Sequence, residues 1–332
     1  MAKQTSDQTE SRKKEHVDLV VSKAAQYSKS SGLEKVNFIH NALPELSLDS
    51  IDLSTEFLKK RISYPILITG MTGGYPDAES INKSLAEAAQ KHGLAFGVGS
   101  QRAMIENPDL ARTYMVRDVA PDIPLLANIG AYQLKGYDFE QIESLVSNIE
   151  ADALAVHLNS LQEVIQPEGD TDFSGVLDAI RRTCDKLSVP VIVKETGAGI
   201  SQEVAIKLKE AGAAYVDIAG AGGTSWSQVE YLRSEGVPGF ENWGIPTLDC
   251  IIQCRGVLPI IASGGIRDGI EAAKCIALGA DIAGAAFPFI KALKENALEE
   301  YVAVIKKQME VCAYLTGSST VSELKKAKLL IS

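Results

Sequence analysis

The chain has 332 residues, of which 45% are hydrophobic and 23% charged, and its formal net charge at pH 7 is −10. These proportions are typical of a globular protein with a sizeable core, and they exclude a disordered or membrane-embedded chain. The acidic balance gives no electrostatic footprint for nucleic acid or anionic lipid, so any bound phosphate must be held by a local cluster of residues. We therefore expect a small anionic ligand.

Cysteine usage and the N-terminal sequence indicate the cellular compartment. The five cysteines form no CxxC pair and no closely spaced framework, so we interpret them as reduced packing residues. The polar start of the chain lacks the apolar segment of a signal peptide, and no later run is long enough to span a bilayer. These features predict a cytoplasmic protein.

Eight short apolar runs alternate with stretches of helical length along the chain. Nearly every position in each run is apolar, as expected for a parallel strand covered by helices on one face and by barrel core on the other. The predicted strands are 65–71, 95–99, 124–129, 153–158, 190–194, 214–218, 259–262 and 281–286. The predicted helices are 77–92, 108–119, 139–149, 174–187, 201–211, 247–255 and 268–278, with a terminal helix from near Pro288.

Eight βα units without a linker-like break favour a closed (β/α)8 TIM barrel of the α/β class over an open doubly wound sheet. We predict that residues 61–332 form this barrel. Residues 1–60 would then form a partly mobile N-terminal extension that packs over one end of it.

Polar residues at the C-terminal ends of the strands carry the most functional weight, because the active site of such a barrel lies there. The seventh predicted strand runs into Gly264, Gly265 and Arg267 and then a helix, and residues 284–287 follow the eighth strand. Glycine lets backbone amides approach a phosphate closely, and a helix N-terminus adds a favourable dipole. Glycines also serve ordinary turns, but this position after strands seven and eight favours a phosphate cradle.

Lys194 ends an apolar strand and admits two interpretations. Its side chain could extend out to solvent, as lysines often do. Because Glu195 beside it falls on the opposite face of the strand, we favour an ammonium directed at an electron-rich ligand such as the edge of a flavin ring.

The densest polar loop runs from His157 to Glu163. A single histidine after a strand is more often structural, whereas several convergent polar side chains favour a site for a polar ligand. A carboxylate such as Glu163 beside phosphate oxygens would suit Mg²⁺, although a solvated loop acid is the alternative.

A second anion site involves the basic trio Arg12, Lys13 and Lys14. Such a trio is usually a solvated tail. Together with Ser100 and Arg102 after the second strand, however, it could close over a diphosphate.

These residues make the chain similar to the type 2 isopentenyl diphosphate isomerases, and the resemblance runs from Arg12 to about Leu330. The block HLNSLQEVIQPEGD at 157–170 is highly specific, whereas ASGGIRDG at 262–269 is shared by many phosphate-binding barrels. The sequence departs from the family pattern at Thr171, Thr196 and Ala198. The other matching blocks are RKKEH at 12–16, ITGMTGG at 68–74, GSQR at 99–102, VKETGAGIS at 193–201, AGAGGTSW at 219–226 and ENWGIPT at 241–247.

The resemblance implies FMN as cofactor, Mg²⁺ at Glu163 and NADPH as the reductant of the flavin. It implies that FMN is held by Met71, Thr72, Gly73, Ser100, Asn128, Lys194, Thr224, Gly264, Gly265, Arg267, Ala286 and Phe287. It implies that the substrate is bound by Arg12, Lys13, Ser100, Gln101, Arg102, His157, Asn159 and Gln162. Gln162 is also the implied catalytic side chain, which would assist proton transfer.

The implied reaction is the reversible isomerisation of isopentenyl diphosphate to dimethylallyl diphosphate in isoprenoid biosynthesis, with reduced FMN as acid and base. The family also implies a homotetramer or homo-octamer. Two alternatives stay open, namely a flavin oxidoreductase of the 2-hydroxy-acid oxidase or dihydroorotate dehydrogenase type and a non-catalytic phosphate-binding barrel. The Gln162–Glu163 pair, together with the basic trio, suits a diphosphate better than a hydroxy acid.

Overall fold

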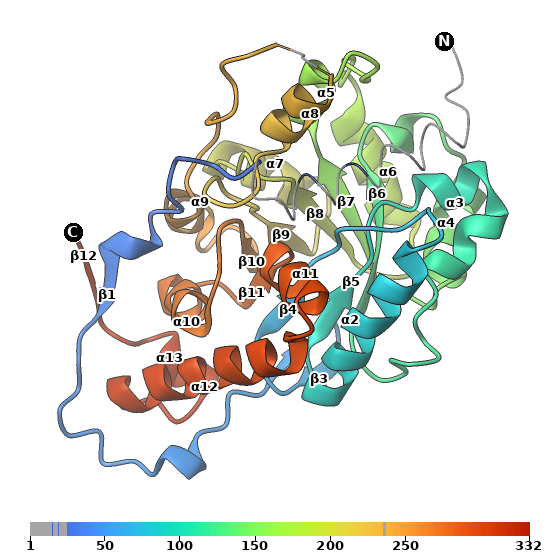
Figure 1. The fold of residues 1–332 in the computed structure, drawn as a ribbon. Coiled ribbons are helices and arrows are strands. Elements are labelled where there is room, and N and C mark those ends of the chain that lie inside the picture. The colour runs from blue at the N-terminus through green and yellow to red at the C-terminus, as the bar shows by residue number, and fades with distance from the viewer. Residues whose placement is uncertain (1–14, 16–18, 20–24, 235–236) are drawn as a thin grey trace.

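The computed structural model describes residues 15, 19, 25–234 and 237–332, and its centre is a closed barrel of eight parallel strands in the order β10-β11-β4-β5-β6-β7-β8-β9 (Figure 1). The prediction of a (β/α)8 barrel is confirmed, and each predicted strand coincides with a barrel strand to within a few residues. The barrel strands are β4 (Ile66–Ile68), β5 (Ala95–Gly97), β6 (Leu125–Gly130), β7 (Ala153–Leu158), β8 (Val191–Glu195), β9 (Tyr215–Asp217), β10 (Ile260–Ser263) and β11 (Ile282–Ala285).

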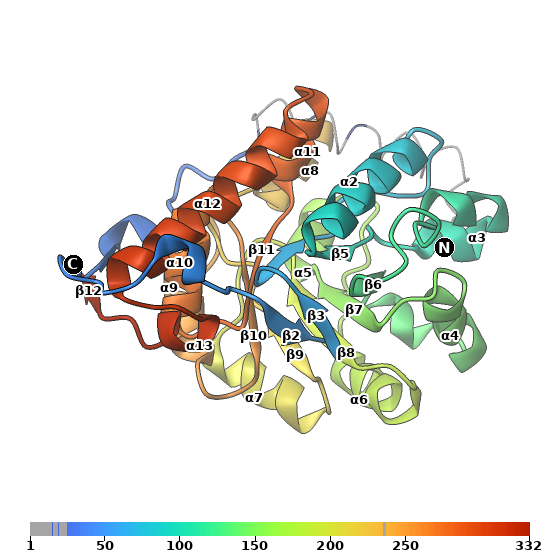
Figure 2. The same ribbon diagram turned by 90° about the horizontal axis from the view of Figure 1, so that it is seen from below.

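Helices surround the barrel and cover its outer face (Figures 1 and 2). Ser201 and Asp268, at which two of the predicted helices begin, are N-caps, because the Ser201 side chain accepts from the amide of Val204 and Asp268 accepts from that of Glu271. The helices are α2 (Ala78–His92), α3 (Arg102–Glu106), α4 (Phe139–Ser147), α5 (Ser160–Ile165), α6 (Val176–Lys186), α7 (Gln202–Glu210), α8 (Trp226–Ser234), α9 (Thr247–Cys254), α10 (Gly269–Leu278), α11 (Phe287–Lys294), α12 (Leu298–Thr316) and α13 (Val321–Leu324). Short 3₁₀ segments are Leu33–Lys35, Leu48–Ser50, Pro108–Thr113 and Gln133–Lys135.

Two predicted helices differ from those observed. The prediction of one helix over 108–119 is wrong, because α3 ends before Asn107 and a 3₁₀ turn over Pro108–Thr113 follows. A residue before proline is disfavoured in the helical region, and Asn107 is extended here. The terminal helix is divided into α11 and α12 near Asn296, whose φ is 55°. In addition, α5 and α8 lie in loops where the sequence pattern predicted no helix.

The N-terminal extension contacts both ends of the barrel, not one. Strands β2 (Thr55–Phe57) and β3 (Lys60–Ile62) form an antiparallel hairpin that lies across the N-terminal end (Figure 2). Phe57 and Ile62 join the cluster of apolar side chains inside the barrel. At the other end, the amide of Tyr27 donates to the carbonyl of Gly223. The division into 1–60 and 61–332 stays a prediction.

The end of the chain lies beside the extension. Strand β12 (Leu329–Ile331) pairs antiparallel with β1 (Val36–Phe38), so the two segments are side by side outside the barrel (Figure 1). Among the described helices, none combines the length with the apolar composition that crossing a membrane requires.

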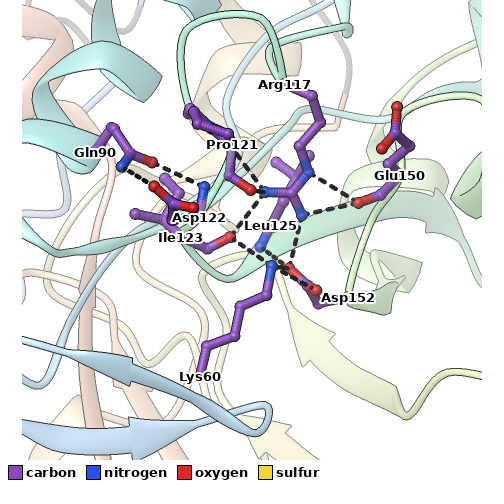
Figure 3. A network of polar contacts seen from close by, with 10 residues as sticks. Lys60, Gln90, Arg117, Pro121, Asp122, Ile123, Leu125, Glu150 and Asp152 are labelled. Carbon is purple, nitrogen blue, oxygen red and sulfur yellow. Dashed lines mark hydrogen bonds and ion pairs between the residues drawn. The ribbon is translucent and has the colours of Figure 1, made fainter.

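A polar network ties the hairpin to the barrel (Figure 3). The Asp152 carboxylate accepts from the Lys60 ammonium at 2.9 Å, from Arg117 at 2.7 Å and from the backbone amide of Leu125 at 2.8 Å. Arg117 also donates to the carbonyl oxygen of Ile123 at 2.9 Å. Because Lys60 belongs to β3 and Leu125 begins β6, this carboxylate connects the hairpin with the barrel wall.

Replacing Asp152 with Ala should lower the free energy of unfolding by about 2–4 kcal/mol, because it leaves a half-buried guanidinium and a backbone amide without their acceptor. Urea denaturation measures this. Asp118→Ala is the control, because the Asp118 side chain is 58% exposed, against 20% for Asp152, and pairs with the surface residue Lys83. Its loss should cost less than about 1 kcal/mol. Equal effects of the two substitutions would contradict the role of the network.

Candidate active site

A cavity of about 230 Å³ opens at the C-terminal ends of the barrel strands. Its wall includes every described residue that the sequence predicted for the site, with the exception of Gln101. The lining residues are Met71, Thr72, Gly73, Ser100, Arg102, Asn128, His157, Asn159, Gln162, Glu163, Lys194, Thr224, Gly264, Gly265, Arg267, Ala286 and Phe287. The predicted Arg12 and Lys13 lie outside the described residues.

Gln101 does not reach the cavity, which differs from the prediction that it contacts the substrate. Its side chain is fully buried, and its amide group donates to the carbonyl of Leu145 and accepts from the amide of Asn128. Both polar atoms of its side chain are therefore used inside the wall of the barrel.

One side of the cavity is made of backbone in close contact. Gly264 and Gly265 have φ values of 99° and 73°, a region that side chains rarely adopt. A Cβ on Gly264 would lie 2.0 Å from the carbonyl oxygen of Gly220, and one on Gly223 would lie 2.6 Å from the amide nitrogen of Gly265. The loops after β9 and β10 can approach this closely only as glycines, which leaves peptide groups on the cavity wall.

The N-terminus of α11 lies on the cavity wall, whereas that of α10 does not. We expected the helix after Gly265 to contribute, but the first turn of α10 is already capped by the Asp268 carboxylate. At the start of α11, by contrast, Ala286 provides no side-chain cap, and residues 286–288 line the cavity. The α11 N-terminus and the glycine loops together suit an anion.

Arg267 stabilises these loops. Its guanidinium donates to the carbonyl oxygen of Gly265 at 3.0 Å and to that of Gly222 at 2.8 Å. The side chain thus connects the loop after β10 to the loop after β9.

Lys194 lies on the cavity wall, and its ammonium donates to the carbonyl oxygen of Glu195 at 2.6 Å. In the interior beside it, Asp217 is buried and accepts from the hydroxyl of Ser263. Burial raises the pKa of the Asp217 carboxyl, while the Lys194 ammonium opposes this shift. These contacts favour the cavity-facing interpretation of Lys194 over the solvent-exposed one.

The buried carboxylate of Glu195 organises the loop after β8. One of its oxygens accepts from the backbone amides of residues 196–199. Burial raises the pKa of the Glu195 carboxyl, and the amides of Gly197 and Ala198 act against this shift. Thr196 and Gly197 line the cavity, so the carboxylate shapes that part of the wall.

The predicted polar loop after β7 forms an ordered cluster. Asn159 donates from Nδ2 to one oxygen of Glu163 at 2.8 Å, and the amide of Asp170 donates to the other at 2.8 Å. Both contacts fix the Glu163 carboxylate beside the cavity. The described residues contain no group of three or more His, Cys, Asp or Glu side chains that could hold a metal ion.

Glu230 is a site residue that the sequence analysis missed. It is fully buried on α8 and accepts from Gln162 Nε2 at 2.7 Å. Arg233 donates to the other Glu230 oxygen at 2.8 Å and also pairs with Glu168. The only sequence signal was the Glu-x-x-Arg spacing of 230 and 233, which is usually a surface ion pair.

Within the part of the chain that the structure describes, two buried polar atoms at the cavity have no hydrogen-bond partner, namely Thr72 Oγ1 and Asn159 Oδ1. Buried polar atoms are rarely left in this state, because losing water without a replacement partner costs free energy. Both residues line the cavity, and Thr72 is only 4% exposed. This arrangement suits a site whose ligand supplies the missing contacts.

Comparison with known proteins first places the chain in a broad class. The family of FMN-dependent dehydrogenases matches residues 148–331. A crystal structure of mandelate oxidase with (S)-2-phenylpropionate has a similar fold, with a TM-score of 0.64 and 16% identity over 97% of this chain and 98% of that one. At this identity the likeness concerns the fold alone.

Closer relatives identify the particular family. An isopentenyl-diphosphate delta-isomerase of Rickettsia africae is 47% identical over 330 residues, covering 96% of each chain. One of Nostoc is 46% identical over 336 residues, covering 97% of this chain and 96% of the relative. The chain belongs to the isopentenyl-diphosphate delta-isomerase family, as its motifs indicated.

Replacing Glu195 with Gln should lower the free energy of unfolding by about 1–3 kcal/mol, because a neutral amide cannot accept from four backbone amides as a carboxylate does. Thermal or urea unfolding measures the effect. Glu203→Gln is the control, since that side chain is 80% exposed, and it should leave the stability nearly unchanged. An unaltered stability in the Glu195 variant would show that the loop after β8 holds its shape by other means.

Proposed function

We propose that this chain interconverts isopentenyl diphosphate and dimethylallyl diphosphate by moving a carbon–carbon double bond. The observation that carries the proposal is the near full-length likeness to isopentenyl-diphosphate delta-isomerases, at 47% identity. The cavity supports it, because Gln162, Asn159 and Glu163 lie together at the end of β7, as the specific block of residues 157–170 predicted.

The cavity fits FMN. The glycine loops and the start of α11 offer backbone amides for its phosphate, and the unpartnered Thr72 hydroxyl offers a further hydrogen bond. When bound and reduced, FMN supplies an acid and a base for proton transfer at carbon, with no net change of redox state. NADPH is proposed as the reductant that prepares it.

The residues of this chain have distinct proposed tasks. Lys194 places a positive charge where the flavin ring would gain electrons. Glu230 orients the Gln162 amide by accepting from its Nε2. The amide oxygen of Gln162 can then accept a hydrogen bond from the proton that is transferred at the substrate. His157, Asn159 and Arg102 hold the diphosphate, and Ser100 contributes its hydroxyl.

The remaining assignments complete the proposal. Mg²⁺ would bind at Glu163, whose oxygens retain lone pairs after accepting from Asn159 and Asp170, and would share its shell with the diphosphate. Arg12 and Lys13 would add positive charge over the substrate. We further propose a cytoplasmic homotetramer or homo-octamer.

The deciding experiment gives isopentenyl diphosphate to the FMN-loaded protein under reducing, anaerobic conditions with Mg²⁺. The expected result is dimethylallyl diphosphate with no net consumption of reductant beyond that needed to reduce the flavin. Failure to form this product would overturn the proposal. Turnover of a 2-hydroxy acid by the same preparation would instead favour the oxidase alternative.

Replacing Gln162 with Asn should reduce kcat about 100-fold, because a side chain shorter by one methylene withdraws the amide by more than 1 Å. Flavin binding should persist, since the substitution leaves the glycine loops intact. Gln90→Asn is the matched control, because Gln90 pairs with Asp122 on the surface. Wild-type turnover in the Gln162 variant would remove this residue from the mechanism.

Replacing Gly264 with Ala should weaken FMN binding at least about tenfold, because the new methyl group would clash with the carbonyl of Gly220 at an unfavourable φ. Fluorescence titration of the apoprotein with FMN measures this. Gly136→Ala is the control, since among the described residues the nearest atom beyond its chain neighbours would lie 3.9 Å from its Cβ. Equal FMN affinities in both variants would refute the role of the glycine loops in binding.

A further inference from the structure

Asn128 makes hydrogen bonds inside the protein with both its backbone and its side chain. It lies in β6 and is only 6% exposed. Its backbone amide donates to Gln101 Oε1 at 2.8 Å, and its carbonyl accepts from the backbone amide of Gln101 at 2.8 Å. Gln101 in turn donates to the carbonyl of Leu145 at 2.9 Å. The Asn128 backbone is thus fixed by a buried side chain that never reaches the cavity.

The side chain of Asn128 is equally constrained. Its Nδ2 donates to the carbonyl oxygen of Val98 at 3.0 Å, and its Oδ1 lies 2.8 Å from Nδ1 of His157. A carbonyl oxygen can only accept, so the NH₂ group of Asn128 must face Val98 and the oxygen must face the histidine. That oxygen also can only accept. The proton of the imidazole must therefore be on Nδ1.

The other ring nitrogen, Nε2, lies near Gly130. A Cβ on Gly130 would be 3.1 Å from His157 Nε2 and 2.0 Å from Gln133 Oε1, and both His157 and Gln133 line the cavity. We propose that Asn128 is a positioning residue that acts through His157, fixing the ring with its proton on Nδ1 so that Nε2 faces the diphosphate.

This role has a chemical consequence for substrate binding. The neutral ring presents a lone pair at Nε2, and only the protonated ring presents an N–H there. His157 must therefore be an imidazolium when it donates to a phosphate oxygen. This part of the inference rests on the proposed function, whereas the position of the proton does not.

The first test measures the ring itself. The chain has four histidines, so long-range ¹H–¹⁵N spectra of the FMN-loaded protein labelled with ¹⁵N-histidine are tractable, and His157→Gln identifies the signal. At a pH of about 9, well above the usual imidazole pKa of about 6.5, His157 should carry its proton on Nδ1. A neutral ring with its proton on Nε2 would overturn the proposal. The measurement needs no substrate, so its outcome is independent of the activity.

The second test changes Asn128. Asn128→Leu removes the acceptor that orients the ring and stabilises its imidazolium, so the proton of the neutral His157 should shift toward Nε2. Because a less well placed and less readily protonated ring holds the diphosphate less tightly, KM for isopentenyl diphosphate should rise about tenfold. Asn128→Asp keeps an acceptor and should restore the Nδ1 proton. Asn82→Leu is the control, because this asparagine is also buried but donates only to the carbonyls of Thr72 and Thr113. It should leave the ring unaltered.

The combined outcomes separate the two claims. An Asn128→Leu protein whose His157 keeps its proton on Nδ1 would overturn the positioning role, even if its activity falls. A shifted proton with an unaltered KM would overturn the link to substrate binding. FMN titration of the same variants distinguishes a loss of flavin from either result.

Discussion

A close approach of main chain to main chain at the wall of the cavity shapes the site for whatever binds there. The loops after β9 and β10 lie so near each other that a single methyl group on Gly264 or Gly223 would meet a backbone atom at 2.0 or 2.6 Å. This contact depends on the parallel pairing of β9 with β10, which brings both loops to one point of the rim. Arg267 then joins them through their carbonyl groups. Because these residues are glycines, no side chain covers their peptide groups, and a ligand in the cavity can contact them.

Buried charged groups in this protein support other residues. A buried carboxylate is tolerated only when donors surround it. Glu195 meets this condition with the amides of its own loop, and Glu230 meets it with Gln162 and Arg233. Asp152, which is only partly buried, has Lys60 and Arg117 as its donors. The first two shape the cavity wall and orient an amide within it. The third acts at the opposite end, where it secures the hairpin.

The barrel was predictable because a parallel strand that is buried on both faces must be apolar at nearly every position, which makes it visible as a short continuous run. The cavity residues followed, since the polar residues after such runs meet at one rim. Glu230 was not predictable, because its partner Gln162 lies on a helix far away in the sequence, α5, which packs against α8. The direction of the Gln101 side chain likewise depends on Leu145 of α4, which nothing near Gln101 in the sequence specifies.

The N-terminal hairpin limits the route by which substrate and product can reach the cavity. Phe57 and Ile62 fill the interior at the N-terminal end of the barrel, where Phe57 packs edge-on against Tyr215 with ring centroids 5.3 Å apart. Among the described residues, these side chains close the barrel axis at this end, so we expect a molecule in the cavity to enter and leave at the C-terminal rim. Substrate and product therefore use the same entrance, so the product must dissociate before the next substrate molecule can bind.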